Sequence, residues 1–164
     1  MDVSAFSSAV EAASGDLLAY FERRIDRHEE AADLLAEVLL IAWRRRRICP
    51  DDTVRARMWL YKIAANVLAN HRRAARRRTA LADRLREHLA TTRRNGPSEA
   101  ATAVADAVRA LPPEHRELVA LVHWDGFSIA HAAEILGVGA STARSRYAVA
   151  KASLRRQLEA GQTV

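Results

Sequence analysis

Residues 128–151 read SIAHAAEILGVGASTARSRYAVAK. Ser128 has the side chain of a helix N-cap, and apolar residues then recur at helical spacing until Gly137-Val138-Gly139-Ala140 interrupts them. A second helix is expected to begin at Ser141-Thr142. Its inward face is predicted to carry Ala143, Tyr147 and Ala150. The pattern therefore predicts two short helices joined by a tight turn, which is the arrangement of a helix-turn-helix.

Between those inward positions the second helix carries hydroxyl and cationic side chains, and residues 137–157 contain no acid. A helix with this surface suits contact with base edges and phosphates in a DNA major groove. The candidate contact residues are Ser141, Thr142, Arg144, Ser145, Arg146 and Lys151. The alternative is an ordinary helical hairpin whose basic face is solvated.

Charge is distributed unevenly along the 164 residues, whose formal net charge is +6. Residues 38–80 hold twelve Lys/Arg against two acids, whereas residues 29–37 form an acidic stripe. Such blocks predict separate cationic surfaces for phosphate and a different partner for the acidic face. The 24 arginines against two lysines favour forked contacts to phosphate and guanine, although a GC-rich genome would produce the same bias.

The compartment follows from what the sequence lacks. The single Cys49 excludes an internal disulfide and any zinc site built on a cysteine pair. The N-terminus does not read as a secretory leader, and the apolar run 38–43 is too short to span a bilayer. We expect a cytoplasmic protein with no membrane insertion.

The fold class is predicted to be all-α, because Ala, Leu, Arg and Glu dominate and β-branched alternation is nearly absent. The breaker-rich residues 90–98 predict a flexible linker between two small helical domains. We place the domains at 1–80 and 104–160, with a linker at 81–103. Helices are expected near 3–13, 16–24, 29–46, 54–78 and 81–89, and near 101–110, 113–124, 129–136 and 141–159. Residues 49–52 form a turn in which Asp52 or Thr53 caps the next helix.

The predicted helix 54–78 has an apolar face and a polar one. Amide side chains can hydrogen-bond a base edge, an aromatic can stack on an unpaired base, and arginines can hold the backbone. These side chains suit binding to an opened DNA strand. In the alternative interpretation, Tyr61 and Trp59 are core aromatics and the arginines form a solvated helix end. The residues placed on the polar face are Tyr61, Lys62, Asn66, Asn70 and Arg73.

Two parts of the chain resemble one family. Residues 33–44 followed by 59–66 (WLYKIAAN) resemble region 2 of the extracytoplasmic-function (ECF) sigma factors, which belong to the sigma-70 family of RNA polymerase subunits. Residues 111–117 (LPPEHRE) and 125–128 (DGFS), together with the helix-turn-helix, resemble their region 4. A helix-turn-helix alone is a weak signal; both regions in the right order are a strong one.

The resemblance implies binding to core RNA polymerase, through its β′ clamp helices and its β flap, and to promoter DNA. The surface for the β′ clamp helices would comprise Asp33, Leu34, Glu37, Leu40, Ile41 and Arg44. The loop 48–57, including Arg55, and the polar face beyond it would capture a flipped-out base of the minus-ten element, whose unstacking must be offset by new contacts. The second helix of the helix-turn-helix would read the minus-thirty-five element. Whether an anti-sigma factor binds the chain stays open.

Several positions depart from the family pattern and bear on polymerase affinity and promoter sequence. They are Ala36 for a usual glutamine, Leu39 for a frequent aromatic, Asn70 for a common aspartate, Gly139 and Ser141 for proline and glycine, and Ala130-His131 for an acidic pair.

Other function classes find less support. The six histidines form no metal-protease pattern, Cys49 has no base placed beside it, and no glycine-rich phosphate loop is present, so we expect neither an enzyme nor a cofactor. A dimeric helix-turn-helix regulator that binds duplex operators without polymerase is the main alternative. A protein-interaction module that uses residues 29–43 is the third. The polar face of helix 54–78 separates these classes, because a dimeric regulator has no use for it.

Overall fold

Helices form all the regular secondary structure in the part of the chain that the computed structural model describes, residues 3–25, 27–89 and 103–161. The predicted all-α class is confirmed. The chain divides into two units, Met1–Arg93 and Arg94–Val164.

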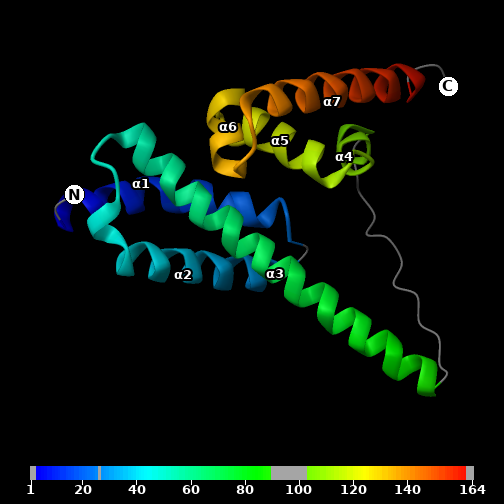
Figure 1. The fold of residues 1–164 in the computed structure, drawn as a ribbon, viewed down its shortest axis with the longest axis horizontal. Helices are drawn as coiled ribbons and strands as arrows, with labels where there is room; N and C mark the ends of the chain where they lie inside the picture. Colours follow the sequence, from blue (N-terminus) through cyan, green and yellow to red (C-terminus); the bar gives the residue numbers. More distant parts are fainter. Residues whose placement is uncertain (1–2, 26, 90–102, 162–164) are drawn as a thin grey trace. The chain divides into compact units, whose positions relative to one another are not determined.

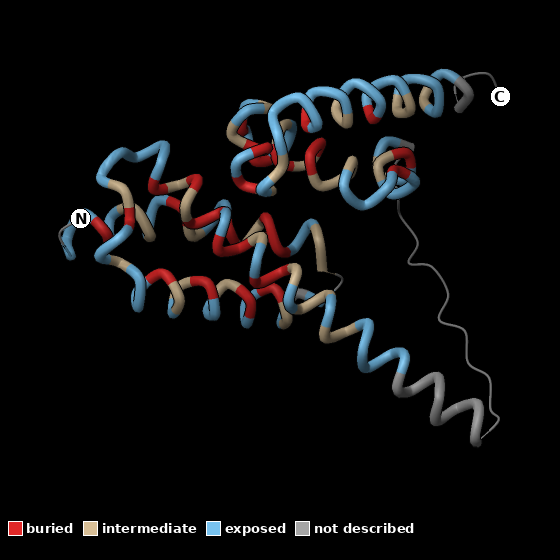
Figure 2. Tube along the Cα trace, viewed as in Figure 1, coloured by how far each residue is buried: buried red, intermediate tan, exposed pale blue. Residues whose placement is uncertain are grey.

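The first unit packs three long helices against one another: α1 (Val3–Glu22), α2 (His28–Arg44) and α3 (Thr53–Leu89). A short 3-10 turn, η1 (Arg46–Ile48), lies between α2 and α3. Figure 1 shows α3 crossing α1 and α2 and continuing well beyond them. The buried positions lie where the three helices face one another (Figure 2).

Aromatic rings form the centre of this core. The Tyr20 ring meets the rings of Phe21 and Tyr61 edge to face, with centroids 5.2 and 5.5 Å away. Edge-to-face pairs of this kind add about 0.5–1.5 kcal/mol to the stabilisation from burial alone. Arg57 ties the start of α3 to α1 through an ion pair with Asp16 (3.2 Å).

Two predicted breaks are absent. The expected helices 3–13 and 16–24 are one helix, because Ala13, Leu17 and Phe21 form a continuous buried stripe across Gly15. The expected helices 54–78 and 81–89 are likewise one, so the first nine residues of the expected linker 81–103 are helical. Residues 90–102 lie outside the described part of the chain.

The second unit contains α4 (Ala103–Arg109), α5 (Pro113–His123), α6 (Ile129–Leu136) and α7 (Ala140–Gly161). Helix α7 packs against the other three, and one cluster of its core joins Leu111, Val119 and Ala150, with Leu154 against it. Figure 2 shows the buried face of α7 turned toward the rest of this unit and its opposite face exposed.

Candidate nucleic-acid interface

The turn between α6 and α7 has well-defined helix caps. Ser128 is the N-cap of α6, and its Oγ accepts a hydrogen bond from the His131 backbone N–H (3.1 Å), which confirms the predicted cap. Gly137 ends α6 with a left-handed φ of 68°, which a residue with a Cβ adopts only at a cost. The Val138 N–H then donates to the Ala133 carbonyl (3.0 Å). These caps fix both ends of α6.

Helix α7 presents five of the six predicted outward residues to solvent. It begins at Ala140 rather than Ser141, so the two hydroxyl residues lie in its first turn. Ala143 and Ala150 are fully buried, as the inward stripe predicted. Arg146 is half-buried; the exposed candidates are Ser141, Thr142, Arg144, Ser145 and Lys151.

One contact that supports α7 was not anticipated from the sequence. The Tyr147 hydroxyl lies 2.8 Å from Nε2 of His123, at the end of α5, and the two rings stack at an interplanar angle of 17°. This pair links α7 to the end of α5. A contact between residues 24 positions apart leaves no periodic signal in the sequence.

In the first unit, four of the predicted contact residues form an exposed row along α3. Lys62, Asn66, Asn70 and Arg73 are spaced by four, four and three residues, which places them on one side of the helix. The Asn70 Oδ1 atom accepts a hydrogen bond from the Arg73 guanidinium. The row therefore offers amide and cationic groups side by side.

Tyr61 is not part of this row, and its predicted placement on the polar face was wrong. Its side chain is fully buried between Tyr20 and the guanidinium of Arg57, which lies 5.0 Å from the ring centroid. A ring in the core cannot stack on an unpaired base. The alternative interpretation of Tyr61 as a core aromatic is the correct one; Trp59 is half-buried.

The loop before α3 is held by a cap. Asp52 accepts a hydrogen bond from the backbone N–H of Arg55 (2.8 Å), which confirms one of the two predicted caps and leaves the Arg55 side chain exposed. Cys49 is buried beside this loop, and burial raises the pKa of its thiol. The side chain is thus neutral at pH 7 and has the properties of a structural cysteine.

Helix α2 presents a mixed acidic and apolar surface. Asp33, Glu37, Leu40 and Arg44 are exposed and follow one another at helical spacing, whereas Ile41 is half-buried. Leu34 is only 6% exposed, so its predicted place on a docking surface was wrong. It faces the core that α2 shares with its neighbours.

Trp43 is an exposed residue that the predicted polymerase-binding set did not include. It is 46% exposed, its ring lies 6.0 Å from that of Phe6, and the Arg46 guanidinium covers it at 4.5 Å. Its position three residues after Leu40 was the available signal, since residues three apart lie on the same side of a helix. Leu40 and Trp43 together form an exposed apolar area on α2.

Metal-binding clusters and membrane-spanning helices are both absent from the described ranges. Nowhere in residues 3–25, 27–89 and 103–161 do three or more His, Cys, Asp or Glu side chains gather in a way that could hold a metal ion. Within the same ranges, none of the helices combines the length and the apolar character needed to cross a bilayer.

Comparison with known families accounts for most of the chain. Residues 9–78 match the model for sigma-70 region 2, and residues 101–154 match the model for sigma-70 region 4. The chain is 32% identical over 135 residues to the ECF RNA polymerase sigma factor SigL of Mycobacterium tuberculosis, an alignment that covers 79% of this chain and 75% of SigL. It is 34% identical over 130 residues to SigM of the same organism, covering 79% of this chain and 65% of SigM.

Solved structures have the same fold. The sigma factor RpoE from Bartonella quintana, solved with the anti-sigma factor NepR, matches with a TM-score of 0.73 and 22% identity over 96% of this chain and 98% of that one. CnrH, solved with the cytosolic domain of CnrY, matches with a TM-score of 0.64 and 25% identity over 97% and 90% of the two chains.

Proteins of this family are non-catalytic subunits that bind RNA polymerase and direct transcription initiation. Membership of the family therefore excludes an enzyme. The region 2 match lies within the first unit, and the region 4 match lies within the second. The chain is an ECF sigma factor of the sigma-70 family, with region 2 and region 4 domains.

Proposed function

We propose that α7 reads the minus-thirty-five element of the promoters that this sigma factor selects. Ser141, Thr142, Arg144 and Ser145 are exposed in its first two turns. The positive end of the helix dipole adds to the attraction for DNA phosphate. Arg144 can hold a guanine edge with two hydrogen bonds, while Arg146 and Lys151 contact the backbone.

For region 2 we infer that the row Lys62, Asn66, Asn70 and Arg73 binds the minus-ten element as it opens. Arg55, exposed near the start of the same helix, would contact the adjacent phosphates. An extruded base loses a few kcal/mol of stacking, which amide hydrogen bonds to its edge can offset. Tyr61 is left out of this set because it is buried.

The polymerase-facing surface is assigned to α2. We propose that Asp33, Glu37, Leu40, Ile41 and Arg44 contact the β′ clamp helices, and that region 4 contacts the β flap. Leu40 and Trp43 supply the apolar centre that stable interfaces have, and the charged residues supply the rim. Binding to polymerase would place the protein in the cytoplasm.

An anti-sigma factor is a further proposed partner. Solved relatives were captured with NepR and with the cytosolic domain of CnrY. The exposed Leu40 and Trp43 on this chain offer an apolar area that such a protein could cover when polymerase is absent.

The proposal that both units bind DNA rests on one observation: each unit exposes a polar and cationic helix face, on α3 in the first and on α7 in the second. The test is transcription in vitro with core polymerase and a library of promoters. Arg144→Ala should weaken selection of the upstream element by about 1–3 kcal/mol at the base it contacts. Arg156→Ala, an exposed arginine further along α7, is the matched control. An equal loss on every sequence would mean that Arg144 contacts only phosphate.

A further inference from the structure

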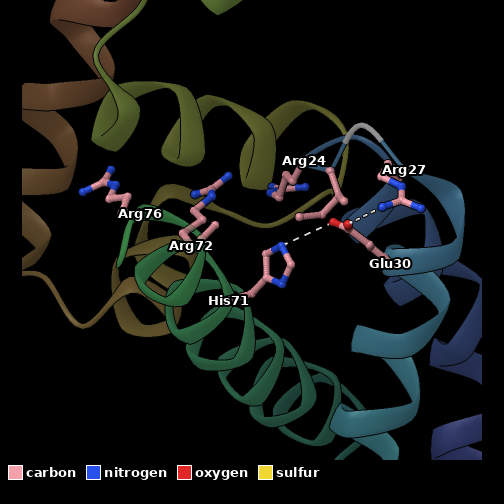
Figure 3. A pocket seen from close by; sticks show the side chains of 8 residues that line it. Arg24, Arg27, Glu30, His71, Arg72 and Arg76 are labelled. Atoms are coloured by element: carbon pink, nitrogen blue, oxygen red, sulfur yellow. Dashed lines mark hydrogen bonds and ion pairs between the residues drawn. The ribbon is translucent and has the colours of Figure 1, made fainter. Parts of the chain in front are cut away.

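An arginine-lined pocket in the first unit has no part in the function proposed above. It is an open hollow of about 440 Å³ between residues close to the start of α2 and the middle of α3. Figure 3 shows Arg24, Arg27 and Glu30 on the side of the pocket near the start of α2. His71, Arg72 and Arg76 lie along α3 on the opposite side. Ile25 and Ala75 complete the lining. The pocket includes none of the exposed row on α3 that we assign to the minus-ten element.

The lining is strongly cationic. Four arginines face one glutamate, which leaves a net charge of +3 before His71 is counted. The start of α2 lies at the same edge, where Glu29 and Glu30 in its first turn offset the positive end of its dipole, and Glu29 also pairs with Arg27 (3.5 Å). A hollow whose walls carry a net charge of one sign concentrates counter-ions of the other sign. The pocket is therefore suited to an anion.

Part of this lining is held in place before any ligand arrives. Arg24 donates a hydrogen bond to the Tyr20 carbonyl (2.9 Å), and its guanidinium lies 3.7 Å from the centre of the Tyr20 ring. Glu30 contacts Arg27 (3.4 Å) on one side and Nε2 of His71 (3.6 Å) on the other. Side chains that are already ordered lose less entropy when they bind a ligand.

We propose that this pocket binds a chain of two or more phosphates. Guanidinium groups match phosphate oxygens with paired hydrogen bonds, which favours phosphate over simple halides. The arginines come from two segments of the chain on opposite sides of a volume within the range of small-molecule sites, so one phosphate would not reach them all. The phosphates could belong to a free nucleoside polyphosphate or to successive nucleotides of a DNA strand; both present the same chemistry.

The test uses the full chain without polymerase or promoter DNA, and its tripolyphosphate arm is independent of the promoter-reading proposal. Inorganic tripolyphosphate and a short fluorescent single-stranded oligonucleotide are titrated separately in magnesium-free buffer at low salt. The pocket variant is Arg72→Gln/Arg76→Gln. The control is Arg77→Gln/Arg78→Gln, which removes the same charge from exposed residues of α3 outside the pocket.

We expect tripolyphosphate affinity to fall roughly tenfold or more in the pocket variant and much less in the control, since hydrogen bonds between charged groups are stronger than those between neutral ones. A loss confined to the oligonucleotide would assign the phosphates to a nucleic-acid strand. Equal losses in both variants, with either probe, would overturn the proposal. Thermal unfolding checks that both variants fold, and Arg76→Gln alone serves if the double variant does not.

Discussion

The Asn66 side chain gives a test of base capture by a single residue. It is exposed on α3 between Lys62 and Asn70, so its removal should leave the core of the first unit unchanged. We expect Asn66→Ala to slow promoter opening about three- to tenfold, the equivalent of one or two hydrogen bonds. The rate is measured on a promoter that starts as a closed duplex, from the permanganate reactivity that thymines gain as they unpair. The same variant should transcribe a pre-melted bubble nearly as well as the parent, and equal losses on both templates would contradict a flipping role.

At the residue scale, the sequence predicted exposure best where a side chain is wholly polar. Lys62, Asn66 and Arg73 are exposed as expected. Tyr61 has an apolar ring with a polar tip, and its position at the boundary of the two helix faces left its direction open. Contact with Tyr20, 41 positions earlier, decided its burial, and no local pattern reports such a contact.

Two glycines in helical segments should respond to alanine in opposite ways. Gly15 lies inside α1, and a methyl group added to its Cα would meet no atom within 4 Å, so Gly15→Ala should stabilise the first unit by about 0.5–1 kcal/mol. Gly137 has a φ of 68°, so Gly137→Ala should destabilise the second unit by about 1–2 kcal/mol despite equally open space. Amide hydrogen exchange, read separately in each unit, measures both effects. A stabilising Gly137→Ala would contradict the left-handed cap.

Gly15 also shows why helix boundaries were partly missed at the element scale. A glycine costs about 1 kcal/mol in a helix interior, which favoured a break after Ala13. Burial of Phe6, Ala13, Leu17 and Phe21 along one face outweighs that cost, because tertiary packing supplies most helix stability. By contrast, α6 has the predicted bounds, since a serine cap and a left-handed glycine mark both of its ends.

Helix α2 carries the prediction for polymerase binding. Glu37 is exposed next to the apolar area of Leu40, so Glu37→Lys would place a cation where we propose contact with the β′ clamp helices. We expect co-purification with core polymerase to be lost, because reversed charge at an interface costs several kcal/mol. Glu11→Lys, a charge reversal at an exposed position of α1, is the matched control. Unchanged co-purification of Glu37→Lys would exclude this face.

At the scale of the whole molecule, the division into two units followed from composition. Glycine, proline and polar residues are concentrated at 90–98, and the units divide between Arg93 and Arg94. Which face of α3 and of α7 is exposed could be determined only from the structure, because burial along these helices depends on how they pack against their neighbours. The first unit exposes a cationic face on α3, and the second unit exposes one on α7.

A protein that holds two promoter elements at once should depend on the distance between them. One turn of DNA spans about 10–10.5 base pairs, so a spacer changed by about five pairs turns the upstream element to the opposite side of the duplex. We expect transcription in vitro to be lost at such spacers even when both elements keep their sequence. Changes of one pair should reduce it less, because the shift in angle is small. Transcription that ignores spacing, together with binding of the free chain to palindromic duplexes as a dimer, would favour an operator-binding regulator instead.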